Sequence, residues 1–228
     1  MAIMRTIAKW TGLALAGVLV LLALAFGALQ TPPGKALLAR VGSSLASSNG
    51  LNVDISGITG FVPANMAVAR IVVSDPKGPF AEVENVSLDW NPLSLLVGTL
   101  DINSAGAARV ALQRKPELPP APAAPQAASS GGGFALPVRV GRLSLDEIVI
   151  GEPVLGHAAV LTLVAAAELR SLDRGLSGAF NLKRRDQPGS LTGRLGYVPQ
   201  TEHLDLDITA EEPAGGLVAR AAGIADLP

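Results

Sequence analysis

Cysteine is absent from this 228-residue chain, and charged and aromatic residues make up only 16% and 4% of it. The lack of cysteine excludes disulfides and thiolate metal sites, but it does not select a cellular compartment. A formal net charge of -1 gives no bulk attraction for nucleic acid, so we expect no nucleic-acid partner. Glycine (25) and proline (17) are abundant instead, which favours β-structure and turns over long solvated helices.

Catalytic motifs are also lacking. The two histidines, His157 and His203, belong to no HExxH motif, and the chain has neither a Walker loop nor GxSxG. Asp205 and Asp207 alternate with apolar residues, which is more typical of the wet face of a strand than of paired catalytic acids. We therefore expect no enzyme, catalytic residue, metal site or cofactor. The alternative, an extracytoplasmic hydrolase, lacks a nucleophile, base and orienting group that can be nominated together.

The longest apolar run covers residues 10–29 and contains no charge. About 20 residues at 1.5 Å rise cross a hydrocarbon core of roughly 30 Å, so we predict a transmembrane anchor here. Residues 1–9, with Arg5 and Lys9, form a short basic tail that we place in the cytoplasm. A cleaved signal peptide is the alternative, with Ala23-Leu24-Ala25 as a small-x-small site. Both interpretations put the rest of the chain outside the cytoplasm.

Residues 31–115 form the first β-rich segment. It opens with a short amphipathic helix at 35–47 and continues in period-2 alternation, the pattern of strands with one buried and one wet face. Val86, Leu88 and Trp90, for example, alternate with Ser87 and Asp89. The sequence Asp75-Pro76-Lys77-Gly78 predicts a turn between two strands, and the sequence LSLLVG after Pro92 predicts a brief apolar turn.

Residues 116–133 are rich in proline, alanine and glycine, which cannot build a core. We interpret them as a linker or long loop whose shortening costs little. Residues 134–228 then form a second β-rich segment. Its strand starts near 177, 190 and 203 recur about every 13 residues and predict an antiparallel meander. In the last strand Leu204, Leu206 and Ile208 alternate with polar residues.

Several stretches, taken in order, resemble the N-terminal region of TamB-like proteins, which belong to the AsmA-like group and are inner-membrane subunits of the translocation and assembly module. They are LNVDISGITG, IVVSDPKGPFAEVENVSLDWNPLSLLVGTLDI, LPVRVGRLSLDEIVIGEPVLG and LDLDITAEEPAGGLVARAAGI. The resemblance implies an inner-membrane anchor, a periplasmic sheet curled into an apolar groove, and an Omp85-type outer-membrane barrel as partner. It also implies a role in outer-membrane protein assembly or phospholipid passage. Members are far longer, and their C-terminal domain, which meets that barrel, has no counterpart here, so we expect a truncated N-terminal piece.

These observations predict a mainly β protein in which an N-terminal transmembrane helix precedes an antiparallel, curled sheet with one or two short helices. We expect a single-pass protein of the bacterial inner membrane, with most of its chain in the periplasm. Its apolar strand faces would contact phospholipid acyl chains, since a curled sheet can cover its apolar side with lipid. The alternative is a closed periplasmic β-sandwich that binds a partner by strand addition. The candidate lipid-facing residues are Val86, Leu88, Trp90, Leu204, Leu206 and Ile208.

Overall fold

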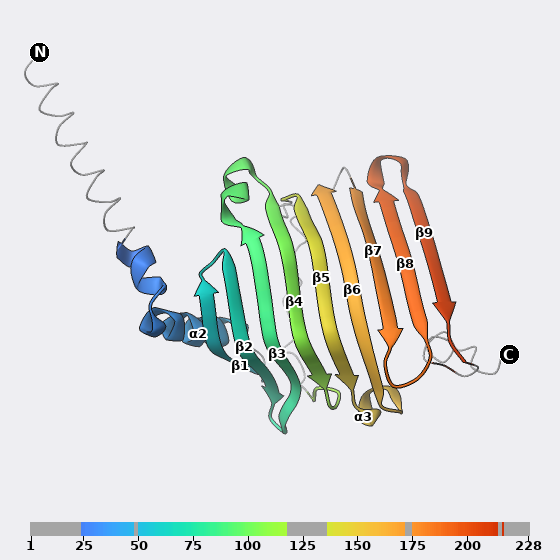
Figure 1. Ribbon diagram of the computed structural model, residues 1–228, viewed down its shortest axis with the longest axis horizontal. Helices are drawn as coiled ribbons and strands as arrows, with labels where there is room; N and C mark the ends of the chain where they lie inside the picture. Colours follow the sequence, from blue (N-terminus) through green and yellow to red (C-terminus); the bar gives the residue numbers. More distant parts are fainter. Residues whose placement is uncertain (1–23, 48–49, 118–135, 172–174, 214–215, 217–228) are drawn as a thin grey trace, which may run out of the picture.

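The computed structural model describes residues 24–47, 50–117, 136–171, 175–213 and 216 (Figure 1). In this part of the chain nine strands form one curled sheet, in which spatial order follows sequence order, and the expected mainly β fold is confirmed. The strands are β1 (Asn52–Phe61), β2 (Asn65–Asp75), β3 (Gly78–Asn91), β4 (Leu100–Leu112), β5 (Val138–Ile150), β6 (Ala159–Ser171), β7 (Gly175–Arg184), β8 (Ser190–Val198) and β9 (His203–Glu211). The two β-rich segments of the sequence thus join in a single sheet.

One strand pair departs from the antiparallel sheet that the sequence predicts. β4 and β5 are parallel, with Leu100 opposite Val138 and Leu112 opposite Ile150. Parallel neighbours need a crossover of a dozen or more residues, because the chain must return to the end of the sheet where the first strand began. Leu112 and Val138 therefore lie at opposite ends of the sheet. The predicted linker lies between them, and its residues 118–133 fall outside the described part of the chain.

Among the described residues, helix α2 precedes the strands, and three short helices connect successive strands. Helix α2 (Pro32–Ala46) is the expected amphipathic helix and begins after Thr31, whose hydroxyl accepts a hydrogen bond from the Gly34 amide at 3.3 Å. The predicted apolar turn between β3 and β4 is the 3-10 helix η1 (Pro92–Val97), closed by Gly98 in the left-handed region at φ 71°. Helix α3 (Glu152–Leu155) connects β5 and β6, and the 3-10 helix η2 (Pro199–Thr201) connects β8 and β9.

The predicted membrane anchor falls mostly outside the described residues. Residues 24–29, at its C-terminal end, are helical, and residues 10–23 are not described. Within the part that the structure describes, no helix is both long enough and apolar enough to cross a bilayer. The ring of Phe26 meets that of Phe61 edge to face, with centroids 5.5 Å apart, so the end of this helix rests against the end of β1.

Helix α2 closes the β1 edge of the sheet. The hydroxyls of Ser43 and Ser47 accept hydrogen bonds from the amides of Ile55 and Val53, each at 2.9 Å. Lys35 donates to the carbonyl of Gly60 at 2.6 Å. Side chains of the helix thus satisfy backbone groups that an edge strand leaves open to another strand.

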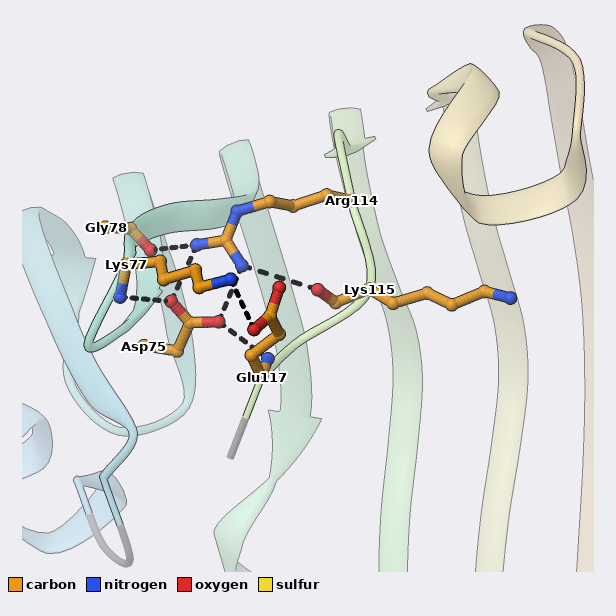
Figure 2. Close-up of polar contacts among 6 residues, drawn as sticks. All are labelled: Asp75, Lys77, Gly78, Arg114, Lys115 and Glu117. Atoms are coloured by element: carbon orange, nitrogen blue, oxygen red, sulfur yellow. Dashed lines mark hydrogen bonds and ion pairs between the residues drawn. The ribbon is translucent and has the colours of Figure 1, made fainter. Parts of the chain in front are cut away.

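A buried ion pair fixes the turn between β2 and β3 (Figure 2). The carboxylate of Asp75 is fully buried and accepts two bonds of 2.6 Å from the guanidinium of Arg114, just after β4. It also accepts hydrogen bonds from the backbone amides of Lys77 and Glu117, at 2.8 and 2.7 Å. The Arg114 guanidinium beside it holds the pKa of the Asp75 carboxyl well below its usual range. This clasp ties the predicted Asp75–Gly78 turn to the chain that follows β4.

Candidate functional site

The register of the sheet places apolar side chains in rows that run across the strands. Directly opposite residues of neighbouring strands point to the same face, so each row can be followed from strand to strand. One row runs from β2 to β9 through Met66, Leu88, Ala105, Leu143, Ala165, Phe180, Gly193 and Ile208. A second runs from β3 to β9 through Trp90, Ile102, Val140, Ala167, Gly178, Leu195 and Leu206. These two rows lie on the same side of the sheet, and we call this side the apolar face.

Local irregularities keep this face apolar where strict alternation would invert it. Val83 and Val86 are three positions apart, which would send them to opposite sides of a regular strand. Asn85 between them has a left-handed backbone, with φ 51°, and both valines lie in apolar rows. In β5 the register shifts between Leu145 and Ile148, again between two apolar positions. These two interruptions of the regular alternation therefore keep the apolar residues of β3 and β5 on the apolar face.

The six predicted lipid-facing residues all lie on the apolar face. Val86, Leu88 and Trp90 come from β3, and Leu204, Leu206 and Ile208 come from β9, at the far edge of the sheet. The register connects the two groups across five intervening strands, β4 to β8. Alternation puts Ser87, Asp89, Asp205 and Asp207 on the other face, as the sequence predicts.

The apolar face is incompletely covered by the protein itself. No large side chain among the described residues is fully buried, and the residues of the buried core are mostly small, such as Ala107 and Ala159. The apolar side chains of β9 are more exposed to solvent: Leu204, Leu206 and Ile208 are 57%, 59% and 53% exposed. Contiguous exposed apolar surface of this kind commonly marks a binding site for lipid or protein.

The opposite face carries the charges. Arg70 pairs there with Glu82 across β2 and β3, and Arg109 with Glu147 across β4 and β5 at 3.3 Å. The Arg70 guanidinium lowers the pKa of the Glu82 carboxyl, because a hydrogen bond to the ionised form favours it. We call this side of the sheet the polar face.

Two overlapping hollows, of about 700 and about 710 Å³, are lined mainly by side chains of the polar face in β5 to β9. Small residues such as Ala166 and Ala179 form their floor, and Arg194 and Asp207 contribute to both. At the β9 edge the second hollow also reaches Leu206, which belongs to the apolar face. The sequence did not predict a depression on the polar face, because neither alternation nor residue type reveals how a sheet bends.

The residues that were weighed for catalysis are not brought together. His157 lies before β6 and His203 begins β9, at opposite ends of the sheet, and His203 contacts Asp205 at 3.1 Å. A separate basic cluster, Lys183-Arg184-Arg185-Asp186, lies at the end of β7, where Arg184 bonds Asp186 at 2.5 Å. This pairing lowers the pKa of the Asp186 carboxyl. Asp186 thus compensates the charge of Arg184, and Arg185 pairs with Glu147 of β5 at 3.9 Å.

Comparisons with protein-family models, with curated proteins and with solved structures found no match for this chain.

Proposed function

We propose that this chain is the inner-membrane-anchored, periplasmic β-groove segment of a TamB-like protein. In this role its apolar face holds phospholipid acyl chains, while its polar face meets water. The protein thereby assists phospholipid passage between the inner and outer membranes, outer-membrane protein assembly, or both. An Omp85-type barrel is the partner that the resemblance implies.

The observation that carries the proposal is the continuity of the apolar rows from β3 to β9. A one-layered sheet with apolar side chains on one face must cover that face with other material. Acyl chains are uniformly apolar and need no directional contacts, so a long row of Leu, Val, Ile and Ala suits them. The nine described strands form one sheet, which does not favour the closed sandwich that the sequence left open.

Leu206→Asp tests the proposal, because Leu206 is 59% exposed in the protein alone. A charge at such a position is expected to change the free energy of unfolding by only about 0.5 kcal/mol or less. Beneath an acyl chain, however, the same charge is desolvated at a cost of a few kcal/mol. Thr209→Asp is the matched control, since it adds the same charge to the same strand on the polar face, opposite Thr192.

The measurement is native mass spectrometry of residues 31–228 purified without detergent from the periplasm. We expect copurifying phospholipid with the unchanged sequence and with Thr209→Asp, and its loss with Leu206→Asp while thermal unfolding stays unchanged. Absence of phospholipid from all three proteins would contradict the proposal, as would equal amounts in all three.

A second candidate function is strand addition at β9. In the described part of the chain, β9 pairs on one side only, with β8, and all nine of its residues are exposed. The β1 edge, by contrast, is bonded by α2. An open edge with exposed aliphatic residues is a template for a further strand. Hydrogen exchange of the β9 amides tests it: a bound partner strand slows their exchange and leaves those of β1 unchanged.

A further inference from the structure

The 3-10 helix η1 presents an aliphatic tip at one end of the sheet. Leu93, Leu96 and Val97 are 70%, 83% and 79% exposed, and Leu95 is 44% exposed. No charged residue occurs between Asn91 and Leu100. Large aliphatic side chains crowded at such exposure are costly in water, so this tip is expected to be covered by an apolar partner.

Several polar groups of the tip are bonded to nearby residues of the chain. The hydroxyl of Ser94 donates to the carbonyl of Asn91 at 2.6 Å and accepts from the amide of Asp101 at 3.2 Å. The amides of Gly98 and Thr99 donate to the carbonyls of Leu95 and Ser94, each at 3.0 Å. A backbone that satisfies its own hydrogen bonds can enter a nonpolar phase at low cost.

A chain of contacts places the tip at the same end of the sheet as the apolar N-terminal segment. The indole N–H of Trp90, two residues before η1, donates to the carbonyl of Pro63 at 2.6 Å. Next to Pro63, the backbone of Val62 bonds the side chain of Gln30 through both its amide and its carbonyl. Gln30 directly follows the uncharged run 10–29. In Figure 1 η1 lies at the upper end of the sheet and α3 at the lower end.

We infer that η1 is a second membrane contact, with Leu93, Leu95, Leu96 and Val97 inserting into the surface of the same phospholipid bilayer that holds residues 10–29. This inference rests on the proposed anchor. The uncharged run ends at residue 29, and Gln30, the next residue, makes the first of the contacts described above. An uncharged aliphatic surface such as η1 also matches the acyl region of a bilayer. A partner protein is the competing occupant, and the experiment below separates the two.

Two contacts would fix how the sheet stands on the membrane. One anchored helix leaves the sheet free to turn about it, whereas a second contact at η1 sets its orientation. Leu100 and Ile102, at the start of β4 and three and five residues after η1, begin the apolar face in this strand, opposite Val138 and Val140 in β5. The apolar face would then start at the lipid surface, so that an acyl chain could reach it without crossing water.

Because the chain contains no cysteine, single cysteines can be introduced and labelled without background. We would label Leu95→Cys and Leu96→Cys with a fluorophore that senses polarity, in the full chain reconstituted into vesicles of phosphatidylethanolamine and phosphatidylglycerol. Leu155→Cys is the matched control, since Leu155 has the same 44% exposure as Leu95 but lies in α3 at the opposite end. Leu24→Cys reports separately on the anchor.

We expect the Leu24, Leu95 and Leu96 labels to shift to shorter emission wavelength and to lose intensity when nitroxide acyl-chain lipids are added. The Leu155 label should change in neither respect. If the Leu24 label responds while the Leu95 and Leu96 labels stay aqueous, the inference is overturned and the anchor stands. Aqueous signals at all four positions overturn both the inference and the anchor. Equal quenching at all four positions indicates nonspecific adsorption and also overturns the inference.

Discussion

Arg114 donates hydrogen bonds from two guanidinium nitrogens to the two carboxylate oxygens of Asp75, each at 2.6 Å. The two residues are 39 positions apart in the chain. The same guanidinium donates to the carbonyl of Gly78 at 2.7 Å and lies over the ring of Phe80. The bidentate geometry is the strong form of an ion pair, and burial protects it from salt. This contact therefore links the β2–β3 turn to the exit of β4.

Loss of the ion pair between Asp75 and Arg114, the clasp, should make the stability of the fold depend less on pH in the acidic range. The pKa of Asp75 lies below its unfolded value near 3.8, so the clasp stabilises the fold fully above that value. Its contribution then falls as the pH drops from about 5 toward the folded pKa. We expect Asp75→Asn to lower the unfolding midpoint at pH 7 and to approach the unchanged protein near pH 2, as measured by thermal unfolding. Asp89→Asn, on the polar face, is the control. A constant difference at all pH values would contradict this account.

The serines of α2 should protect the edge of β1. Ser43→Ala together with Ser47→Ala removes the acceptors for the Ile55 and Val53 amides, at about 0.5 to 1.5 kcal/mol for each bond. We expect both amides to exchange faster with deuterium, measured residue by residue by NMR, while β5 is unaffected. Ser44→Ala, at an exposed position of the same helix, should change nothing. Unchanged exchange in the double variant would mean that the helix protects the edge without these bonds.

The length of the segment between β4 and β5 should have a lower limit. Leu112 and Val138 lie at opposite ends of strands about 40 Å long, at roughly 3.3 Å per residue. Removal of residues 121–125 should leave the thermal unfolding midpoint unchanged. Removal of 116–133 leaves only 113–115 and 134–137, which reach about 25 Å at most, so the β4–β5 pairing should be lost. Native-like unfolding of the larger deletion would contradict the parallel pairing.

The N-terminal segment should keep the protein in the membrane. An alkaline phosphatase reporter fused after Gly34 is expected to be active, and the mature N-terminus to lie near Met1, because the uncharged run 10–29 is long enough to span. Both are measured directly, by reporter assay and by N-terminal sequencing. A soluble product beginning near Phe26 would identify the run as a cleaved signal peptide.

Alternation revealed the strands and their faces wherever a strand is regular. The meander of β7, β8 and β9 follows from the spacing of its turns, and Leu204, Leu206 and Ile208 share a face as the period-2 pattern predicts. The turn at Asp75 was also readable, since Pro and Gly there supply the necessary backbone angles. These features depend on neighbours in the chain, which the sequence displays directly.

The left-handed backbone of Asn85 was not predicted, although the three-residue spacing of Val83 and Val86 is a signal for an interruption of the alternation. Features that depend on distant residues were not predicted either. The parallel pairing of β4 and β5 was missed as well, although a segment as long as 113–137 is what a crossover requires. Likewise, the partnership of Asp75 and Arg114 joins positions that no local pattern connects.

We propose that the apolar face binds acyl chains and that the polar face does not. The most direct measurement places a photocrosslinking amino acid at Leu206 or Ile208, and separately at Asp205 or Asp207, in the full chain in intact cells. These positions alternate along one exposed strand, so they differ in the face that they occupy and little else. The account predicts phospholipid adducts at Leu206 and Ile208 and none at the two aspartates. Equal labelling on both faces, or no lipid adduct at Leu206 and Ile208, would contradict it.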